Sequence, residues 1–276
     1  PDTILYYVRR VIKASGLIED YDRGKIVRGL LWSGLSKGQA EEVLVEVEKN
    51  LPQLVTTDEI HERVATVLRE KFPTQALKYI LKRAVMMLGP TGYPFEKYFA
   101  LLLERIGYHT TTNLIIQGKC VSHEVDVVAE KAGKVYMVEC KHHNSPGLKT
   151  DVKVVLYVYA RFLDLRDHFD NSWIATNTKL TEDAKSYVEC MGMLATAWRY
   201  PLENSLEKLI TKTRLYPITV LFTLDKALRM KLLANNIVTT EQVVKLGYEE
   251  LSRVVGIPLQ KSKQIVSEAS LVNNLF

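Results

Sequence analysis

The sequence has little cysteine and no long uninterrupted hydrophobic run. Its three cysteines, Cys120, Cys140 and Cys190, stand far apart and form neither a disulfide framework nor the close pairs of a zinc site. No segment approaches the roughly 18 uninterrupted apolar residues of a membrane helix, and the first residues show no basic-then-apolar targeting signal. We therefore expect a cytoplasmic protein with no structural zinc and no membrane partner.

Two further absences concern nucleotides and polyanions. The phosphate-binding motif G-x-x-x-x-G-K-[ST] does not occur, so nucleotide hydrolysis at such a loop is not expected. The 37 Lys and Arg against 32 Asp and Glu give a net charge of +5, and the excess is not gathered into a basic tail. A nucleic-acid surface would therefore have to arise from the folded arrangement.

The chain of 276 residues is long enough for two or three domains. Its clearest linker is GPTGYP, residues 89–94. Helical periodicity dominates before this linker, where Thr56 and Glu59 predict a capping box. After it, the order helix, hairpin, helix, strand, helix, strand indicates an α/β domain with a mixed sheet, and short helices follow. We predict a multi-domain α+β protein with domains 1–89, 90–215 and 216–276.

The hairpin HEVDVVAEKAGKVYMVECKHH, residues 123–143, carries charged side chains that half-buried strands normally avoid. Side chains alternate along a strand, so Glu139 and Lys141 should project from one face while Cys140 points away. Pairing of the two strands would bring Asp126 near Glu139. Such a group of hard oxygen ligands beside a cation suits Mg²⁺. From the spacing alone, however, a solvated or salt-bridged strand is the commoner explanation.

Other groups near this hairpin leave alternatives open. Glu96 lies at the edge of the apolar face of the helix FEKYFALLLERIG and can face the sheet as a third acid. It can equally be a solvated glutamate that favours the helix N-terminus. Glu124 shares a strand face with Asp126 as an extra acid or a salt-bridge partner. The roles of His142 and His143, at the strand end, also remain open.

The region of residues 92–215 resembles the PD-(D/E)XK nuclease superfamily, specifically the Mrr-like restriction endonucleases. The segments that carry the resemblance are GYPFEKYFALLLERIGY, HEVDVVAE, VECK and WIATNTKLTEDAKSYVECMG. It implies a DNA endonuclease that depends on Mg²⁺ or Mn²⁺. The implied catalytic residues are Glu96, Asp126, Glu139 and Lys141. The implied metal ligands are Asp126, Glu139 and the carbonyl of Cys140. The His-Glu pair before Asp126 departs from the small residues of many relatives.

The first segment gathers basic side chains near a turn at Gly16, and TTDEIH offers a helix N-terminus that attracts anions. A solvated basic helix is the commoner explanation of that pattern. Residues 4–88 are nevertheless similar to the ATP-cone, the nucleotide-sensing module of ribonucleotide reductases. The similarity implies ATP or dATP as an effector. The implied nucleotide-binding residues are Val11, Lys13, Glu19, Lys25, Thr57 and His61. Ala14 stands where that family commonly has arginine, which puts the affinity in doubt.

The last segment, KLLANNIVTTEQVVKLGYEELSRVVGIPLQKSKQIVSEA, looks like a helix-hairpin-helix DNA-binding module. Its turn contains Gly256 and, in place of a second glycine, Pro258, which removes an N–H donor. Lys261 and Lys263 can still bind a DNA backbone without sequence preference. A helical dimerisation or docking unit is the alternative, and a homodimer remains open.

These features together predict a nucleotide-regulated, Mg²⁺-dependent DNA endonuclease of a restriction or defence type. One alternative is a non-catalytic DNA-binding regulator that responds to ATP or dATP and retains a nuclease fold. Another is a repair or processing nuclease that differs in substrate. The sequence specifies neither the recognition site nor a preference for methylated DNA.

Overall fold

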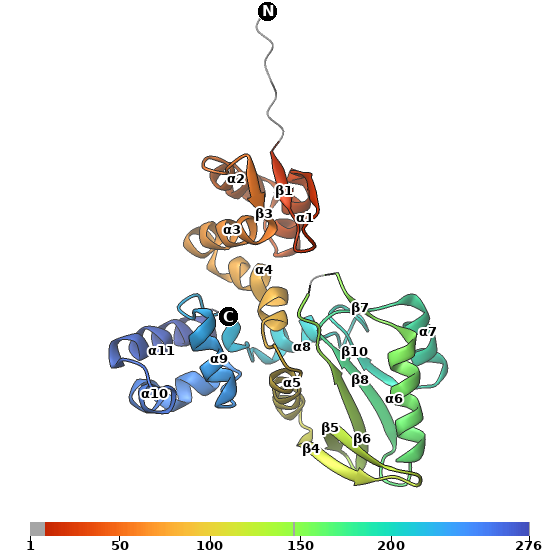
Figure 1. Cartoon of the computed structure of the whole chain (residues 1–276). Coiled ribbons are helices and arrows are strands. Elements are labelled where there is room, and N and C mark those ends of the chain that lie inside the picture. The colour runs from red at the N-terminus through yellow and green to blue at the C-terminus, as the bar shows by residue number, and fades with distance from the viewer. Residues whose placement is uncertain (1–8, 146, 276) are drawn as a thin grey trace, which may run out of the picture. The chain divides into compact units, whose positions relative to one another are not determined.

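The computed structural model describes residues 9–145 and 147–275 (Figure 1). Residues 4–8 of the ATP-cone resemblance therefore lie outside the described residues. The described chain divides into two compact units between Leu81 and Lys82. The division falls inside the helix Pro73–Met86, because the last turn of this helix packs with the second unit. There the Thr219 hydroxyl donates a hydrogen bond of 2.6 Å to the Ala84 carbonyl.

The first unit combines helices with a three-stranded sheet in the order β2-β1-β3. Strand β1 runs antiparallel to β2 and parallel to β3. The helices agree with the predicted periodicity, but these strands were not predicted because each has only three residues. The elements are β1 (Arg10–Ile12), β2 (Ile18–Asp20), α1 (Arg23–Trp32), α2 (Lys37–Glu48), β3 (Leu54–Thr56), α3 (Thr57–Lys71) and α4 (Pro73–Met86).

Side-chain caps set the starts of the helices in the first unit. The predicted capping box of α3 is confirmed, since Thr56 and Glu59 satisfy each other's backbone N–H groups. Ser36 and Gln39 form a second box at α2. The helices bury their apolar faces in one core, whose fully buried members include Leu30, Val43, Leu44, Val64 and Leu68.

The second unit is built on a mixed five-stranded sheet in the order β10-β8-β6-β5-β4. Strands β4, β5 and β6 are antiparallel neighbours, whereas β6, β8 and β10 run parallel. The elements up to residue 213 are α5 (Tyr93–Arg105), β4 (His109–Gln117), β5 (Ser122–Lys131), β6 (Lys134–Lys141), β7 (Lys149–Thr150), α6 (Val152–Asp164), β8 (Asn171–Thr176), β9 (Lys179–Leu180), α7 (Glu182–Cys190), β10 (Leu194–Thr196) and α8 (Leu206–Thr213).

Helices cover both faces of this sheet, as Figure 1 shows. Val158 of α6 and Val188 of α7 share a buried core with Ile174 of β8 on one face. On the other face, Phe99 of α5 packs edge-on against Trp173 of β8, with ring centroids 5.9 Å apart. The mixed sheet covered by helices is the predicted α/β arrangement, and the multi-domain α+β class is confirmed.

The C-terminal segment is helical, as predicted. Its elements are η1 (Ile218–Val220), α9 (Lys226–Ala234), α10 (Thr240–Val255) and α11 (Leu259–Asn273). Element α10 consists of two helical stretches that meet at a kink at Gly247, whose φ of 72° is not helical. The segment is tied to the nuclease-like part, since Arg105 of α5 forms an ion pair with Glu241 of α10. No described helix is long and apolar enough to cross a membrane.

Candidate active site

The candidate site lies where strands β5 and β6 part. Their pairing begins at a two-residue turn and stops at Val127 and Val138, one residue short of Asp126 and Glu139. Beyond that point, the Asp126 carboxylate reaches across and accepts a hydrogen bond of 2.7 Å from the Cys140 N–H. The strands therefore open at the two predicted carboxylates, and the bond fixes Asp126 across the gap.

Glu139 is buried beside Asp126, and burial dominates its electrostatics. Desolvation raises the pKa of Glu139 to about 7, and the negative charge of Asp126 adds to that rise. Arg161 and Lys141 act in the opposite direction. Burial also raises the pKa of Asp126, against the Cys140 N–H bond that lowers it. Two mutually repelling carboxylates of this kind favour a bound cation.

Glu96 lies in the first turn of α5. Its pKa is raised to about 7 by burial first, and then by the charges of Asp126, Glu124 and Glu139. A glutamate in bulk solvent would show no such rise, so the sheet-facing alternative describes its position. Lys141, the last residue of β6, acts electrostatically on Asp126 and Glu139. The fold thus gathers all four predicted catalytic side chains, while their chemical roles remain predictions.

The donor atoms fit Mg²⁺ or Mn²⁺ better than zinc. The described residues contain no group of three or more His, Cys, Asp or Glu side chains that could hold a metal ion. Asp126 and Glu139 instead offer two carboxylates beside the main-chain carbonyl of Cys140. Mg²⁺ is usually held by one or two carboxylates with water and substrate phosphate, whereas structural zinc takes four protein ligands.

The two histidines after Lys141 are held by groups of the protein. The His142 ring lies 5.4 Å from the Phe95 ring, and its Nε2 is 3.1 Å from the Val85 carbonyl oxygen. His143 has its Nε2 3.0 Å from the Thr150 hydroxyl. Burial lowers the pKa of both imidazoles. These contacts place both imidazoles against the protein at the strand end, while their roles remain open.

Arg161 of α6 is a charged residue of this site that the sequence did not indicate. Its Nη1 lies 2.5 Å from Oε2 of Glu139, and only 9% of the residue is exposed. Arg161 belongs to the buried stripe of α6 that otherwise consists of Val155, Val158 and Phe162. The sequence signal that could have identified Arg161 was a single charged residue on an otherwise apolar helix face.

The predicted nucleotide-binding residues all lie in the first unit. Glu19 of β2 forms ion pairs with Lys13 and Lys25 at 3.0 and 3.3 Å, and hydrogen bonds from both lysines lower its pKa. The remaining members are Val11, buried in β1, Thr57, whose hydroxyl donates to the Ile12 carbonyl, and His61, whose ring packs on Tyr79. The fold therefore brings Lys13, Glu19 and Lys25 together, and Glu19 pairs with both lysines.

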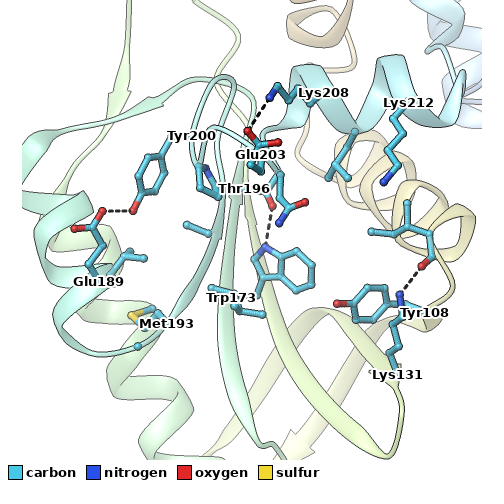
Figure 2. A pocket seen from close by; sticks show the side chains of 18 residues that line it. Tyr108, Lys131, Trp173, Glu189, Met193, Thr196, Tyr200, Glu203, Lys208 and Lys212 are labelled. Atoms are coloured by element: carbon cyan, nitrogen blue, oxygen red, sulfur yellow. Dashed lines mark hydrogen bonds and ion pairs between the residues drawn. The ribbon is translucent and has the colours of Figure 1, made fainter.

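A cavity of about 560 Å³ lies at the β10 edge of the second unit (Figure 2). Its lining includes Tyr108 and Trp173. Several of its polar side chains already have partners, as Figure 2 shows for Lys208 with Glu203. None of the predicted catalytic residues lines this cavity.

Comparison with known proteins places these parts in families. The ATP cone domain model matches residues 9–85, the restriction endonuclease model, Mrr_cat, matches residues 89–195, and a model described as AF1548-like, C-terminal matches residues 216–272. An uncharacterized protein of Archaeoglobus fulgidus is 45% identical over 174 residues, which are 63% of this chain and 98% of that protein. The chain belongs to the AF1548-like family.

A solved relative is described as the crystal structure of a protein of unknown function, AF1548. It is 42% identical with a TM-score of 0.60, covering 66% of this chain and 98% of that chain. The order of ATP-cone, restriction-endonuclease and C-terminal domains in this AF1548-like protein is the predicted one. The nuclease resemblance is confirmed by the Mrr_cat match, which spans the whole β5–β6 hairpin. The helix-hairpin-helix resemblance of residues 216–272 remains a prediction.

Proposed function

We propose that this AF1548-like protein is a Mg²⁺-dependent DNA endonuclease whose activity responds to ATP or dATP. The observation that carries the proposal is the opening of the β5–β6 ladder at Asp126 and Glu139, with Glu96 and Lys141 gathered there. The match to the restriction endonuclease family supports the same chemistry. Metal-dependent phosphodiester hydrolysis can use this combination of a metal-holding carboxylate pair and a nearby cation.

Each residue of the candidate site would have a distinct chemical role. Asp126, Glu139 and the Cys140 carbonyl would hold Mg²⁺, which supplies Lewis acidity toward the phosphate and its attacking water. The Cys140 N–H fixes the Asp126 carboxylate, so one oxygen is committed and the group is oriented. Lys141 would donate to charge that develops on the phosphate. Glu96, with a pKa of about 7, would accept or return a proton near neutral pH.

Nicking of supercoiled plasmid DNA tests this function directly. We expect cleavage with Mg²⁺, none with EDTA, and a loss of about 100-fold or more in Asp126→Asn and Lys141→Met. Glu130→Gln and Lys134→Met are matched controls, because both residues lie exposed on the same two strands. Full activity in Asp126→Asn or Lys141→Met would contradict the proposal.

A non-catalytic DNA-binding regulator is the second candidate, and the Glu139–Arg161 ion pair is the observation that favours it. A carboxylate neutralised by an arginine can remain stable with no metal at all. Calorimetry with Mn²⁺ separates the two functions. The endonuclease predicts binding that Asp126→Asn removes, whereas the regulator predicts no binding to either protein.

The C-terminal helices would assist by contacting the DNA backbone. Gly256 ends α10 in the left-handed conformation, and Pro258 caps α11, so the two helices form a hairpin. Lys261 and Lys263 follow in the first turns of α11. Loss of either lysine should weaken DNA binding by a similar factor for every sequence and should flatten the salt dependence, which filter binding measures.

A further inference from the structure

Arg161 occupies a position where an arginine is costly unless it has a further use. It replaces an apolar residue in the buried stripe of α6 and forms an ion pair with Glu139, whose side chain is also about nine-tenths buried. Buried ion pairs of this kind seldom stabilise a fold more than well-packed apolar side chains would. Stability alone therefore does not account for a guanidinium at this point of the sheet.

The hydrogen bonding of Arg161 is incomplete. Its Nη1 donates to Oε2 of Glu139, but its buried Nε–H has no hydrogen-bond partner among the described residues. A buried donor left unpaired is unfavourable, and more so when it belongs to a charged group. The site therefore lacks one acceptor next to the carboxylates of the proposed metal centre.

The guanidinium is also held in a fixed orientation by an aromatic ring. Its central carbon lies 5.4 Å from the centroid of the Tyr157 ring, one turn earlier on α6. Tyr157 is 58% exposed, so the buried guanidinium packs against a side chain that reaches the protein surface. Stacking on an aromatic ring orients a guanidinium while leaving its in-plane N–H groups for an anion.

The charges of the site indicate which anion fits. Asp126 and Glu139 are the groups that the proposed metal would neutralise, and Glu139 is the carboxylate that Arg161 contacts. A divalent cation bound to Glu139 would neutralise this carboxylate in place of Arg161. The N–H groups of the guanidinium would then be available to a second acceptor. A non-bridging phosphate oxygen meets this need, because guanidinium and phosphate form strong charge-assisted hydrogen bonds.

We propose that Arg161 is a further substrate-binding residue of this centre and that its unpaired Nε–H binds a phosphate oxygen of the DNA. The inference rests on the proposed endonuclease function and names a residue that the sequence pattern did not include. Lys141 belongs to strand β6 and Arg161 to helix α6. The phosphate is therefore contacted from both the sheet and the helix.

Arg161→Lys tests the inference, because it keeps the charge beside Glu139 and removes the Nε–H and the planar fork. We expect unfolding temperature and Mn²⁺ affinity close to those of the unmodified protein, with a single-turnover cleavage rate at saturating DNA lower by about tenfold or more. Arg199→Lys is the matched control, since Arg199 pairs with Glu207 at 2.6 and 3.0 Å outside this site. It should retain the full rate.

Two results would overturn the role of Arg161 while leaving the endonuclease in place. One is an unchanged rate in Arg161→Lys. The other is a parallel fall in rate and Mn²⁺ affinity, which would make Arg161 a residue that only positions Glu139. Failure of the unmodified protein to bind Mn²⁺ and to nick DNA would instead remove the proposed function, and the inference with it.

A second variant keeps the inference testable if Arg161→Lys does not fold. Tyr157→Leu removes the aromatic face that orients the guanidinium, at an exposed position where substitution is tolerated. We expect its single-turnover rate to fall severalfold with unchanged Mn²⁺ affinity, whereas Tyr157→Phe should behave as the unmodified protein does. Equal rates in both variants would contradict the inference.

Discussion

Glu96 shows at the scale of single residues how position changes chemistry. It lies in the first turn of α5, yet its carboxyl group faces Asp126 and Glu139 instead of bulk solvent. Burial and neighbouring negative charge raise its pKa to about 7. In the unfolded chain the same group would lose its proton near its ordinary pKa of 4.5. This difference couples the protonation of Glu96 to folding.

The stability of the protein in EDTA should therefore depend on pH through Glu96. A raised folded pKa means that the folded state holds a proton which the unfolded state has already released. The free energy of unfolding should fall as pH rises from about 4.5 to about 7. Glu96→Gln should show a smaller fall over that window in denaturant titrations. Identical pH profiles for the two proteins would contradict the assigned pKa.

Gly89 illustrates a second effect at this scale, a close approach between two loops. A Cβ at this position would lie 2.1 Å from Oδ1 of Asn144, whose Nδ2 donates to the Pro90 carbonyl. Gly89→Ala should therefore displace the Asn144 amide and lower the free energy of unfolding by about 1–2 kcal/mol. Gly38→Ala is the control, because a Cβ there meets no atom within 4 Å. Urea denaturation measures both.

At the scale of elements, Asp164 ties the end of α6 to the β4–β5 turn. Asp164, the last residue of α6, accepts hydrogen bonds from the backbone N–H groups of Cys120 and Val121 at 2.7 and 3.2 Å. Its Oδ2 also lies 2.8 Å from Nε2 of His123. These bonds hold the pKa of the Asp164 carboxyl well below its usual range.

Asp164→Ala should loosen this turn without unfolding the sheet. We expect faster hydrogen exchange at Cys120 and Val121, because their N–H groups lose an acceptor. Exchange in the β6–β8 pairing should remain slow, since that pairing lies at the centre of the sheet. Asp167→Ala, on the loop after α6, serves as the control. Unchanged protection at residues 120 and 121 would show that other contacts hold the turn.

At the scale of the whole molecule, the proposed regulation joins two separate compact units. The chain passes from one unit to the other within α4, whose residues lie on both sides of the division at Leu81 and Lys82. The proposed nucleotide-binding residues all belong to the first unit and the candidate catalytic residues all belong to the second.

We expect ATP or dATP to bind to the first unit and to change the nicking rate. Lys13→Met should weaken nucleotide binding by about tenfold through loss of one phosphate contact, and should abolish the rate change while basal nicking persists. Lys49→Met is the control, because Lys49 pairs with Glu46 on the surface of α2. Calorimetry and nicking assays with and without ATP give both quantities. Equal affinity in Lys13→Met would exclude that lysine from the nucleotide site.

The sequence by itself determined most helices, because these depend on local periodicity and capping, as Thr56 with Glu59 shows. The domain order and the four side chains of the candidate site were predicted through resemblance to known families, since the spacing of Asp126, Glu139 and Lys141 alone fits a solvated strand as well. The three-residue strands of the first unit were missed, since segments so short show no alternation. They exist only through pairing with distant residues.

Tertiary structure decided how the candidate site is arranged. The end of the β5–β6 pairing at Val127 and Val138, and the Cys140 N–H bond that holds Asp126, depend on how three strands meet. Arg161 lies 22 residues from Glu139 in the sequence, and only the packing of α6 on the sheet brings them to 2.5 Å. Local patterns specify elements, whereas desolvation and ion pairing depend on neighbours that folding alone brings together.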